Sequence, residues 1–294
     1  MLGHEAIGNI IKIGKKVKNL KEGDDVIISW LPYNPQRNTQ YLEWCDVTWK
    51  NKKIKSIIFT WADYTVLHNQ FVSKIPNYLD KYSGSVIGCA VATGAGSVNN
   101  IANLKKSQSV AVFGAGGLGL FTINAARIKG ADPIIAIDID DKKLSLASEV
   151  GADFTINSKK EDPVKKIISL TNGGADFVFD MVGVPSVQDQ TIESSKEGIL
   201  GYSQGGIIIL AGFPHSSRNF NPRLLINGQR TYIGSKGGFT NPKIDFPQYF
   251  NEYKTKELPL EKIITNNYKL NEINLAIEDL VNNNIIGRGV IEID

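Results

Sequence analysis

The chain has 294 residues, of which 42% are hydrophobic and 21% charged, and its 33 basic and 30 acidic residues leave a formal net charge of +3. This length can bury two cores, so we expect two domains. No segment gathers the positive charge into a stripe, and no apolar stretch approaches the roughly 20 residues that cross a bilayer, which argues against nucleic-acid and membrane partners. Two cysteines and the lack of an export signal favour a cytoplasmic protein.

The first part of the chain has the short strands and turns of a β domain. Residues 7–13 and 26–28 have strand composition, and turn sequences at 14–16 and 23–25 lie between them. The polar, proline-containing residues 31–56 predict a surface loop. Strand character returns at 57–59 and 64–66, and a helical pattern begins after Pro76.

A strand, a glycine-rich turn and a helix follow one another from residue 109. The apolar residues 109–113 predict a strand, residues 120–129 a helix, and residues 133–137 a second strand that ends at Asp138. The turn after the first strand is Gly114-Ala115-Gly116-Gly117-Leu118-Gly119. In such a turn the first glycine permits the tight bend, the second lets the backbone approach a pyrophosphate, and the last lets the helix pack on the strand. The turn therefore predicts a dinucleotide at the helix N-terminus, where free N–H groups favour negative charge.

The acid at the end of the second strand distinguishes between the two nicotinamide cofactors. Asp138 follows Gly119 by 19 residues, where a carboxylate accepts hydrogen bonds from the adenosine ribose and repels a ribose phosphate, so NAD is favoured over NADP. Further strands are predicted at 154–156, 177–180 and 206–210, and their alternation with helices predicts a doubly wound parallel sheet. Because methyltransferases use a similar glycine loop, S-adenosylmethionine binding is the alternative that the loop alone leaves open.

Two further motifs accompany the glycine loop. Gly3-His4-Glu5-Ala6-Ile7-Gly8 is followed by Gly14, Val17 and Gly23-Asp24-Asp25-Val26, and a second motif is Gly88-Cys89-Ala90-Val91-Ala92-Thr93-Gly94. With these motifs the chain resembles, nearly from end to end, the zinc-containing alcohol dehydrogenase branch of the medium-chain dehydrogenase/reductase superfamily. The resemblance implies an α/β fold: a mostly-β GroES-like catalytic domain at 1–90, to which the chain returns at 234–294, and a Rossmann NAD-binding domain at 91–233.

The resemblance also implies the residues of the site. His4 and Cys89 would be ligands of a catalytic Zn²⁺, and Glu5 a close neighbour that can approach or coordinate the metal; imidazole nitrogen and thiolate suit a tetrahedral zinc site with one open position. The implied cofactor contacts are Gly114, Gly116, Gly117, Leu118 and Gly119 in the loop, Thr93 at the nicotinamide, Asp138 and Lys143 at the adenosine ribose, and Arg288 at the pyrophosphate. Without the motifs, a cysteine in an apolar run is usually a core residue and a histidine beside a chain terminus is usually solvated; a solvated face explains Lys143, at a charged helix start, equally well.

The sequence departs from the family pattern at two places. Members usually carry a few tens of residues before the Gly-His-Glu motif, including another zinc cysteine and the hydroxyl residue that begins proton transfer, so we expect a truncated chain or a degenerate relative. Many relatives hold a structural zinc with four cysteines in the segment that corresponds to 31–56, which here contains only Cys45. We therefore expect no structural zinc and do not take Cys45 as the missing catalytic ligand.

The resemblance predicts an NAD-dependent oxidoreductase that acts on an alcohol or on an aldehyde or ketone, with zinc polarising the substrate oxygen. A zinc-free quinone reductase-like enzyme using NADPH and a catalytically inactive dinucleotide-binding relative are the open alternatives. The catalytic acid or base is not assigned, because His68 and His215 both have sequence surroundings typical of surface positions. The resemblance also implies a homodimer, or a tetramer of dimers, formed by edge strands near 206–210 and 231–234.

Overall fold

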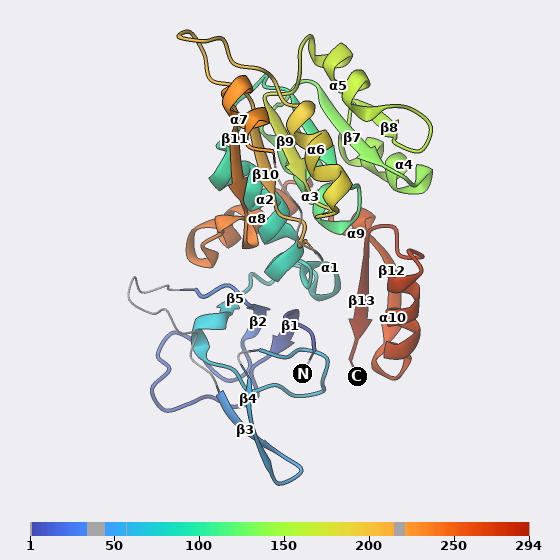
Figure 1. The fold of residues 1–294 in the computed structure, drawn as a ribbon. Helices are drawn as coiled ribbons and strands as arrows, with labels where there is room; N and C mark the ends of the chain where they lie inside the picture. The colour runs from blue at the N-terminus through green and yellow to red at the C-terminus, as the bar shows by residue number, and fades with distance from the viewer. Residues whose placement is uncertain (1, 34–44, 57, 215–220, 294) are drawn as a thin grey trace. The chain divides into compact units, whose positions relative to one another are not determined.

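The computed structural model describes residues 2–33, 45–56, 58–214 and 221–293 (Figure 1). The chain forms two compact units. The first is Met1–Ala92 together with Thr240–Asp294, and the second is Thr93–Phe239. His215 lies outside the described residues. In the part of the chain that is described, no helix has the length and apolar composition of a membrane span.

A three-stranded antiparallel sheet in the order β1-β2-β5 lies in the first unit. Its strands are β1 (Glu5–Asn9), β2 (Asp25–Ser29) and β5 (Val72–Lys74). The central strand β2 is buried along Val26, Ile27 and Ile28, which confirms the strand predicted there. The strand predicted at 7–13 instead runs from Glu5 to Asn9, because β2 offers it only five paired positions.

A two-stranded hairpin contradicts part of the predicted surface loop at 31–56. Strands β3 (Cys45–Trp49) and β4 (Lys52–Ser56) pair antiparallel, with Trp49 opposite Lys52. The two residues of the turn, Lys50 and Asn51, both have positive φ, at 46° and 60°. Such a two-residue turn matches the right-handed twist of paired strands. The prediction failed because Lys-Asn is a weaker turn signal than Asn-Gly, and β4, with three lysines and a serine, lacks strand composition, although β3 alternates apolar and polar residues.

The strands predicted at 57–59 and 64–66 are wrong where they are described. Residues 58–59 and 64–66 have no strand structure, and residue 57 lies outside the described part. Tyr64 and Val66 are 73% and 59% exposed. Their β-forming side chains do not make a strand here because no strand among the described residues pairs with them.

Helical segments and a further two-stranded sheet also lie in the first unit. After Pro76 come α1 (Lys81–Gly84) and a π-helical turn, η2 (Ile87–Val91), as the helical pattern predicted. The returning chain forms α8 (Pro242–Lys254), α9 (Leu260–Ile263), β12 (Ile264–Lys269), α10 (Ile273–Val281) and β13 (Arg288–Glu292). β12 and β13 pair in parallel, so a strand that precedes α10 and one that follows it form a single small sheet.

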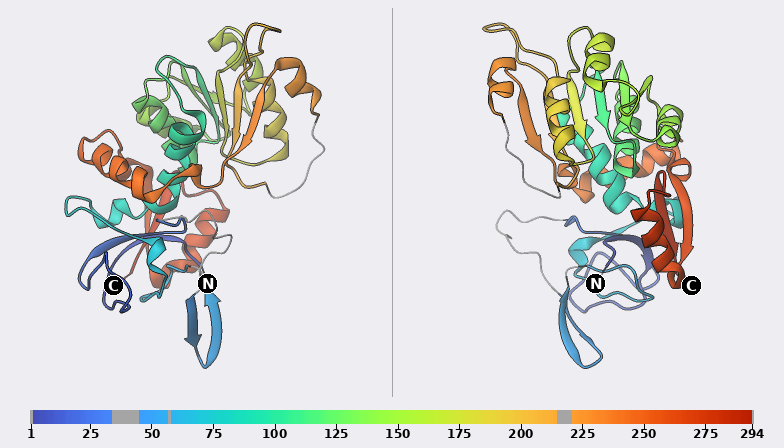
Figure 2. Two further views of the ribbon diagram at one scale, coloured as in Figure 1. Left: turned by 90° about the vertical axis from the view of Figure 1, so that its left-hand side faces the viewer. Right: turned by 45° about the vertical axis from the view of Figure 1, so that its right-hand side comes forward.

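The second unit is a six-stranded parallel sheet in the order β11-β10-β9-β6-β7-β8, which confirms the doubly wound fold. Its strands are β6 (Val110–Phe113), β7 (Ile134–Asp138), β8 (Phe154–Asn157), β9 (Phe177–Asp180), β10 (Ile207–Leu210) and β11 (Thr231–Gly234). The helices are α2 (Ala92–Gly96), α3 (Gly117–Ile128), α4 (Asp141–Val150), α5 (Pro163–Thr171), α6 (Pro185–Glu193) and α7 (Arg223–Gly228). Figure 2 shows helices on both faces of the sheet, which explains why the inner strands β6, β7, β9 and β10 are apolar apart from the terminal Asp138 and Asp180.

The strand order corrects one prediction about the sheet edges. β10 pairs with β9 on one side and with β11 on the other, so the edge-strand role predicted for 206–210 is wrong. Within the described sheet, the edges are β11 and β8. β10 has an inner position because the chain places β9, β10 and β11 successively outward from β6, after β7 and β8 have filled the other side.

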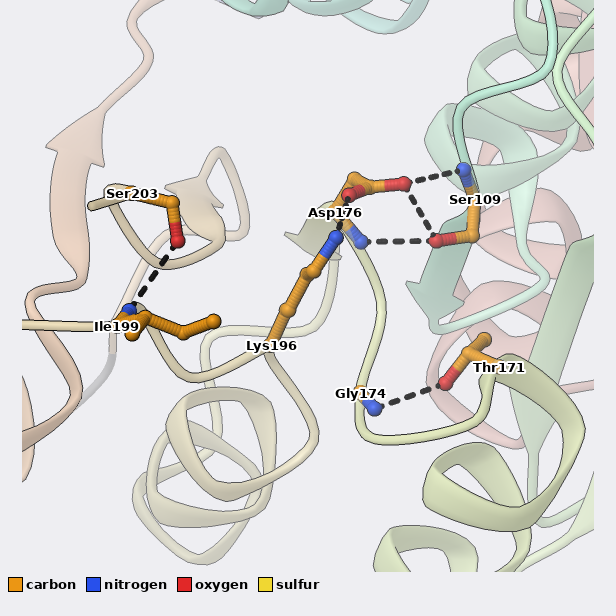
Figure 3. Close-up of polar contacts among 7 residues, drawn as sticks. All are labelled: Ser109, Thr171, Gly174, Asp176, Lys196, Ile199 and Ser203. Carbon is orange, nitrogen blue, oxygen red and sulfur yellow. Dashed lines mark hydrogen bonds and ion pairs between the residues drawn. The ribbon is translucent and has the colours of Figure 1, made fainter.

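A hydrogen-bonded pair ties the amino ends of the two central strands, β6 and β9 (Figure 3). Asp176 Oδ2 accepts hydrogen bonds from the backbone N–H and the hydroxyl of Ser109, at 2.9 and 2.8 Å, and the Ser109 hydroxyl accepts one from the Asp176 N–H at 2.9 Å. Lys196 Nζ lies 3.3 Å from Asp176 Oδ1. Burial of this carboxyl opposes ionisation, but the hydrogen bonds from Ser109 and the charge of Lys196 outweigh it and hold the pKa of Asp176 below its ordinary value.

Candidate metal and cofactor sites

Three side chains of types that bind metal ions meet in the first unit. His4 precedes β1, Glu5 begins it, and Cys89 lies in the π-helical turn η2. One donor atom from each of the three lies within 4.8 Å of the others, and His4 Nε2 is 3.2 Å from Cys89 Sγ. Zinc bonds of ordinary length at a tetrahedral angle separate nitrogen and sulfur ligands by about 3.6 Å. The His4–Cys89 pair therefore needs only a small adjustment to hold a zinc ion, and the donor types of the cluster are ones that zinc prefers.

Two glycines of the sequence motifs let the segments of this cluster approach each other. Gly3 has φ +80°, and a Cβ there would collide with the side chains of Thr60 and Trp61. A Cβ at Gly88 would collide with the backbone carbonyl of Ile28 in β2. The Gly88 carbonyl also accepts a hydrogen bond from the buried Ser29 hydroxyl at 2.5 Å. The turn that carries Cys89 is thus anchored directly on β2, beside the strand that begins at Glu5.

Glu5 is held by groups from two other segments of the first unit. Its Oε2 accepts a hydrogen bond from the Ala90 N–H at 3.0 Å, and its Oε1 forms an ion pair with the Arg288 guanidinium at the start of β13. The Glu5 side chain is 12% exposed and the Arg288 side chain 32%. The structure thus places Arg288 against Glu5, and its predicted contact with a pyrophosphate stays a prediction.

Three of the four glycines in the glycine turn of the second unit are glycine for three different physical reasons. Gly114 has φ +93°, which favours glycine, and its N–H donates to the Ile137 carbonyl at 2.7 Å. A Cβ at Gly119 would overlap the carbonyl oxygen of Gly114. A Cβ at Gly116 would have no atom within 4 Å. The fold therefore requires glycine at 114 and 119, whereas at Gly116 the open space beside the N-terminus of α3 suits the close approach of a bound phosphate.

Asp138 is fixed beside this turn. Its Oδ2 accepts a hydrogen bond from the Ala115 N–H at 2.8 Å, and its Oδ1 accepts from the N–H groups of Ile139 and Asp140 at 2.7 and 3.1 Å. The carboxylate therefore has a set orientation at the end of β7, next to the glycine turn, as the sequence predicted. Gly117 and Leu118 form the first turn of α3.

The other predicted cofactor residues are less closely tied to the turn. Thr93 is 6% exposed, and its neighbour Gly94 packs against α3, where a Cβ at Gly94 would lie 2.7 Å from the Leu118 carbonyl oxygen. Lys143 is half-buried in the first turn of α4, which follows β7.

His68, for which a surface position was expected, accepts a hydrogen bond from the Gln70 N–H at 3.3 Å through Nδ1 and so caps a short helical turn.

One side chain in the second unit has an environment that sequence patterns did not reveal. Asp180 ends β9 and is fully buried. Desolvation raises the pKa of this carboxyl above its ordinary value, although hydrogen bonds from the N–H groups of Gly183 and Val182 act in the opposite direction. The sequence signal that could have identified it is an acid that ends an apolar strand, as Asp138 does.

Comparisons with known proteins cover both units. The family model described as alcohol dehydrogenase GroES-like domain matches residues 1–77, and the one described as zinc-binding dehydrogenase matches residues 117–255. The alcohol dehydrogenase class-P of Arabidopsis thaliana is 32% identical over 307 residues, which span 95% of this chain and 79% of the relative. The S-(hydroxymethyl)glutathione dehydrogenase of Saccharomyces cerevisiae is 31% identical, over 100% of this chain and 82% of the relative. The solved structure of benzyl alcohol dehydrogenase from Acinetobacter calcoaceticus has a TM-score of 0.85 and 26% identity, over 100% of this chain and 84% of that one.

Proposed function

Because this chain belongs to the family of zinc-dependent alcohol dehydrogenases and is an oxidoreductase acting on CH–OH groups, we propose that it transfers a hydride between an alcohol or carbonyl compound and NAD(H), with one catalytic zinc. The observation that carries this proposal is the convergence of His4, Glu5 and Cys89 within 4.8 Å. Bound zinc would supply Lewis acidity toward the substrate oxygen, and bound nicotinamide would accept or donate the hydride.

In this proposal the first unit holds the metal. His4 and Cys89 are the nitrogen and sulfur ligands, and Glu5 is a third donor whose position is set by Ala90 and Arg288. Arg288 offsets the negative charge of Glu5, which would otherwise lie unscreened beside a thiolate. Because both Glu5 oxygens already have partners, Glu5 would have to exchange one of them in order to coordinate the metal.

The second unit holds the cofactor. The N–H groups at the start of α3, in Gly117, Leu118 and Gly119, would bind the pyrophosphate over the open side of Gly116. Asp138 would accept hydrogen bonds from the adenosine ribose and repel a 2′-phosphate, so NAD is the proposed cofactor rather than NADP. Further contacts are proposed for Thr93 at the nicotinamide, Lys143 at the ribose and Arg288 at the pyrophosphate.

Zinc content and alcohol oxidation test this proposal together. We expect purified protein to contain zinc near one ion per chain, measured by mass spectrometry, and to reduce NAD⁺ in the presence of a panel of primary and secondary alcohols, followed at 340 nm. NADP⁺ serves as the matched cofactor control, and Asp138→Asn should narrow the preference for NAD⁺. Enone reduction with NADPH in zinc-free protein would favour the quinone reductase alternative, and NADH binding without zinc or turnover would favour the inactive relative.

We also propose a homodimer that pairs through the edge strand β11. This strand is paired only with β10 in the described sheet, and unpaired edges of this kind readily add a strand from a second chain. A monomeric mass by light scattering at micromolar concentration would contradict it.

A further inference from the structure

Asp180 lies where the strand order of the sheet reverses. β9 pairs with β6 on one side and with β10 on the other, and Asp180 is opposite Phe113 in β6 and Leu210 in β10. The residues that follow these two neighbours are Gly114 of the glycine turn and Ala211. In open sheets of parallel strands, ligands bind outside the carboxyl ends of the strands at this reversal point.

The Asp180 carboxylate organises the chain that leaves β9. Its Oδ1 accepts hydrogen bonds from the N–H groups of Val182 and Gly183, at 2.9 and 2.8 Å. Its backbone carbonyl accepts from the N–H groups of Ala211 and Gly212, both at 2.9 Å. One residue thus fixes the loop after β9 with its side chain and the loop after β10 with its backbone.

The loop after β9 packs directly on the glycine turn. A Cβ at Gly114 would lie 2.6 Å from Val182 Cγ2. Gly183 has φ +75°, and a Cβ there would lie 2.8 Å from the backbone of Gly212. The loop is therefore confined between the turn that would hold the pyrophosphate and the end of β10. In this loop the Met181 N–H donates to the Phe113 carbonyl, and the next two N–H groups donate to Asp180.

Stability of the fold alone does not account for a carboxyl group at this place. Asp180 is completely buried, with 0% solvent exposure. Its Oδ2 has no hydrogen-bond partner among the described residues. Asp176, at the other end of β9, is only partly buried, hydrogen-bonded through both oxygens and paired with Lys196. Burying a polar atom without a partner costs free energy that an apolar residue would avoid.

We propose that Asp180 is a positioning residue for the nicotinamide cofactor, which holds the loop after β9 against the glycine turn so that the half of the cofactor beyond the pyrophosphate meets a preformed surface. Val182, Val184 and Phe213, which follow β9 and β10, are 36%, 39% and 83% exposed. Apolar side chains exposed at the ends of these strands are suited to a nicotinamide ring. This inference rests on the proposed NAD-dependent function.

NADH titration of purified protein, followed by fluorescence, tests the inference. In Asp180→Ala, the N–H groups of Val182 and Gly183 lose their acceptor, and we expect the Kd for NADH to rise about tenfold. Asp180→Asn keeps an oxygen that can accept both hydrogen bonds, so it should restore a Kd within about twofold of the wild type. The matched control is Asp176→Ala, which removes a carboxylate from the other end of the same strand and should leave the Kd unchanged while lowering the melting temperature.

Each outcome decides between the proposals. An unchanged Kd in folded Asp180→Ala, or an equal rise in Asp176→Ala, would overturn the positioning role and leave the proposed function intact. If the wild-type protein itself does not bind NADH, the proposed cofactor is wrong and the positioning role falls with it. If Asp180→Ala does not fold, Gly183→Ala keeps the carboxylate but pushes the loop from Gly212; we expect it to weaken NADH binding, and wild-type affinity in this variant would overturn the inference.

Discussion

The two candidate sites of this protein are built in opposite ways. In the second unit, one continuous segment from Gly114 to Gly119 forms the whole turn, and its shape follows from backbone angles and close contacts within a few residues. In the first unit, His4 and Cys89 are 85 positions apart, and Glu5 takes its partners from η2 and β13. The cofactor turn is therefore a local structure, whereas the cluster of His4, Glu5 and Cys89 forms only when two distant segments have packed, and a third segment supplies Arg288.

The largest expected effect separates the two sites. Cys89→Ser removes the thiolate ligand, and we expect zinc to be lost and kcat/KM for alcohol oxidation to fall by about a thousandfold. NADH affinity should stay within about twofold, because the glycine turn belongs to the other unit and contains none of the cluster. Zinc analysis by mass spectrometry and NADH fluorescence measure the two properties on the same sample. A parallel loss of NADH affinity would show that the sites are not independent.

Two glycine substitutions distinguish a glycine that the fold requires, Gly119, from one that the bound cofactor requires, Gly116. Gly119→Ala places a Cβ on the Gly114 carbonyl oxygen, so we expect a loss of about 1–3 kcal/mol in the free energy of unfolding and NADH binding weaker by about a hundredfold. Gly116→Ala has open space around its Cβ, so unfolding should change by less than about 0.5 kcal/mol while NADH binding still weakens. Urea denaturation and NADH titration check both variants. Full NADH affinity in Gly116→Ala would refute the phosphate-approach role.

Substitution of Arg288 tests whether zinc binding by His4, Glu5 and Cys89 depends on the ion pair between Arg288 and Glu5. Arg288→Gln leaves Glu5 without its cation, and we expect zinc affinity to fall by about 10- to 100-fold, as for other groups that orient metal ligands. Arg288→Lys should recover part of it, because the charge is retained without the planar guanidinium. Competition with a zinc chelator measures the affinity. A drop in NADH affinity in the same variants would support the predicted pyrophosphate contact, and unchanged values for both ligands would contradict both roles.

The smallest expected effects extend the comparison to the two ends of β9. The pKa of Asp176 is lowered in the folded protein, so its stabilisation is present above the unfolded value of about 3.9 and is lost as pH falls through the folded pKa. The pKa of Asp180 is raised, so its contribution is present below about pH 3.9 and is lost as pH rises through the folded pKa. Asp176→Asn should flatten the acid limb of a stability profile from thermal melts, by less than about 1 kcal/mol. Asp180→Asn should flatten the part of the stability profile at higher pH. If both substitutions shift stability in the same direction, the opposite pKa shifts assigned to Asp176 and Asp180 are wrong.

The sequence was most informative where structure is decided by neighbours along the chain. Closely spaced glycines, a strand of apolar residues and an acid at the next strand end are local signals, and they predicted the β6, α3 and β7 elements, the turn and the place of Asp138. The same reasoning missed the hairpin β3–β4 and assigned strands at 57–59 and 64–66. A strand needs a partner, and composition does not say whether one is available.

Tertiary structure decided everything that depends on pairing at a distance. It placed β10 inside the sheet rather than at an edge, brought His4 and Glu5 to Cys89, and set Arg288 against Glu5. It also buried Asp180 at the strand reversal. The sequence by itself determined which residues could form a turn or bind a metal, because backbone angles and side-chain chemistry belong to single residues. Which of them meet depends on the packing of the whole chain, since each contact is stabilised only when all of its neighbours are in place.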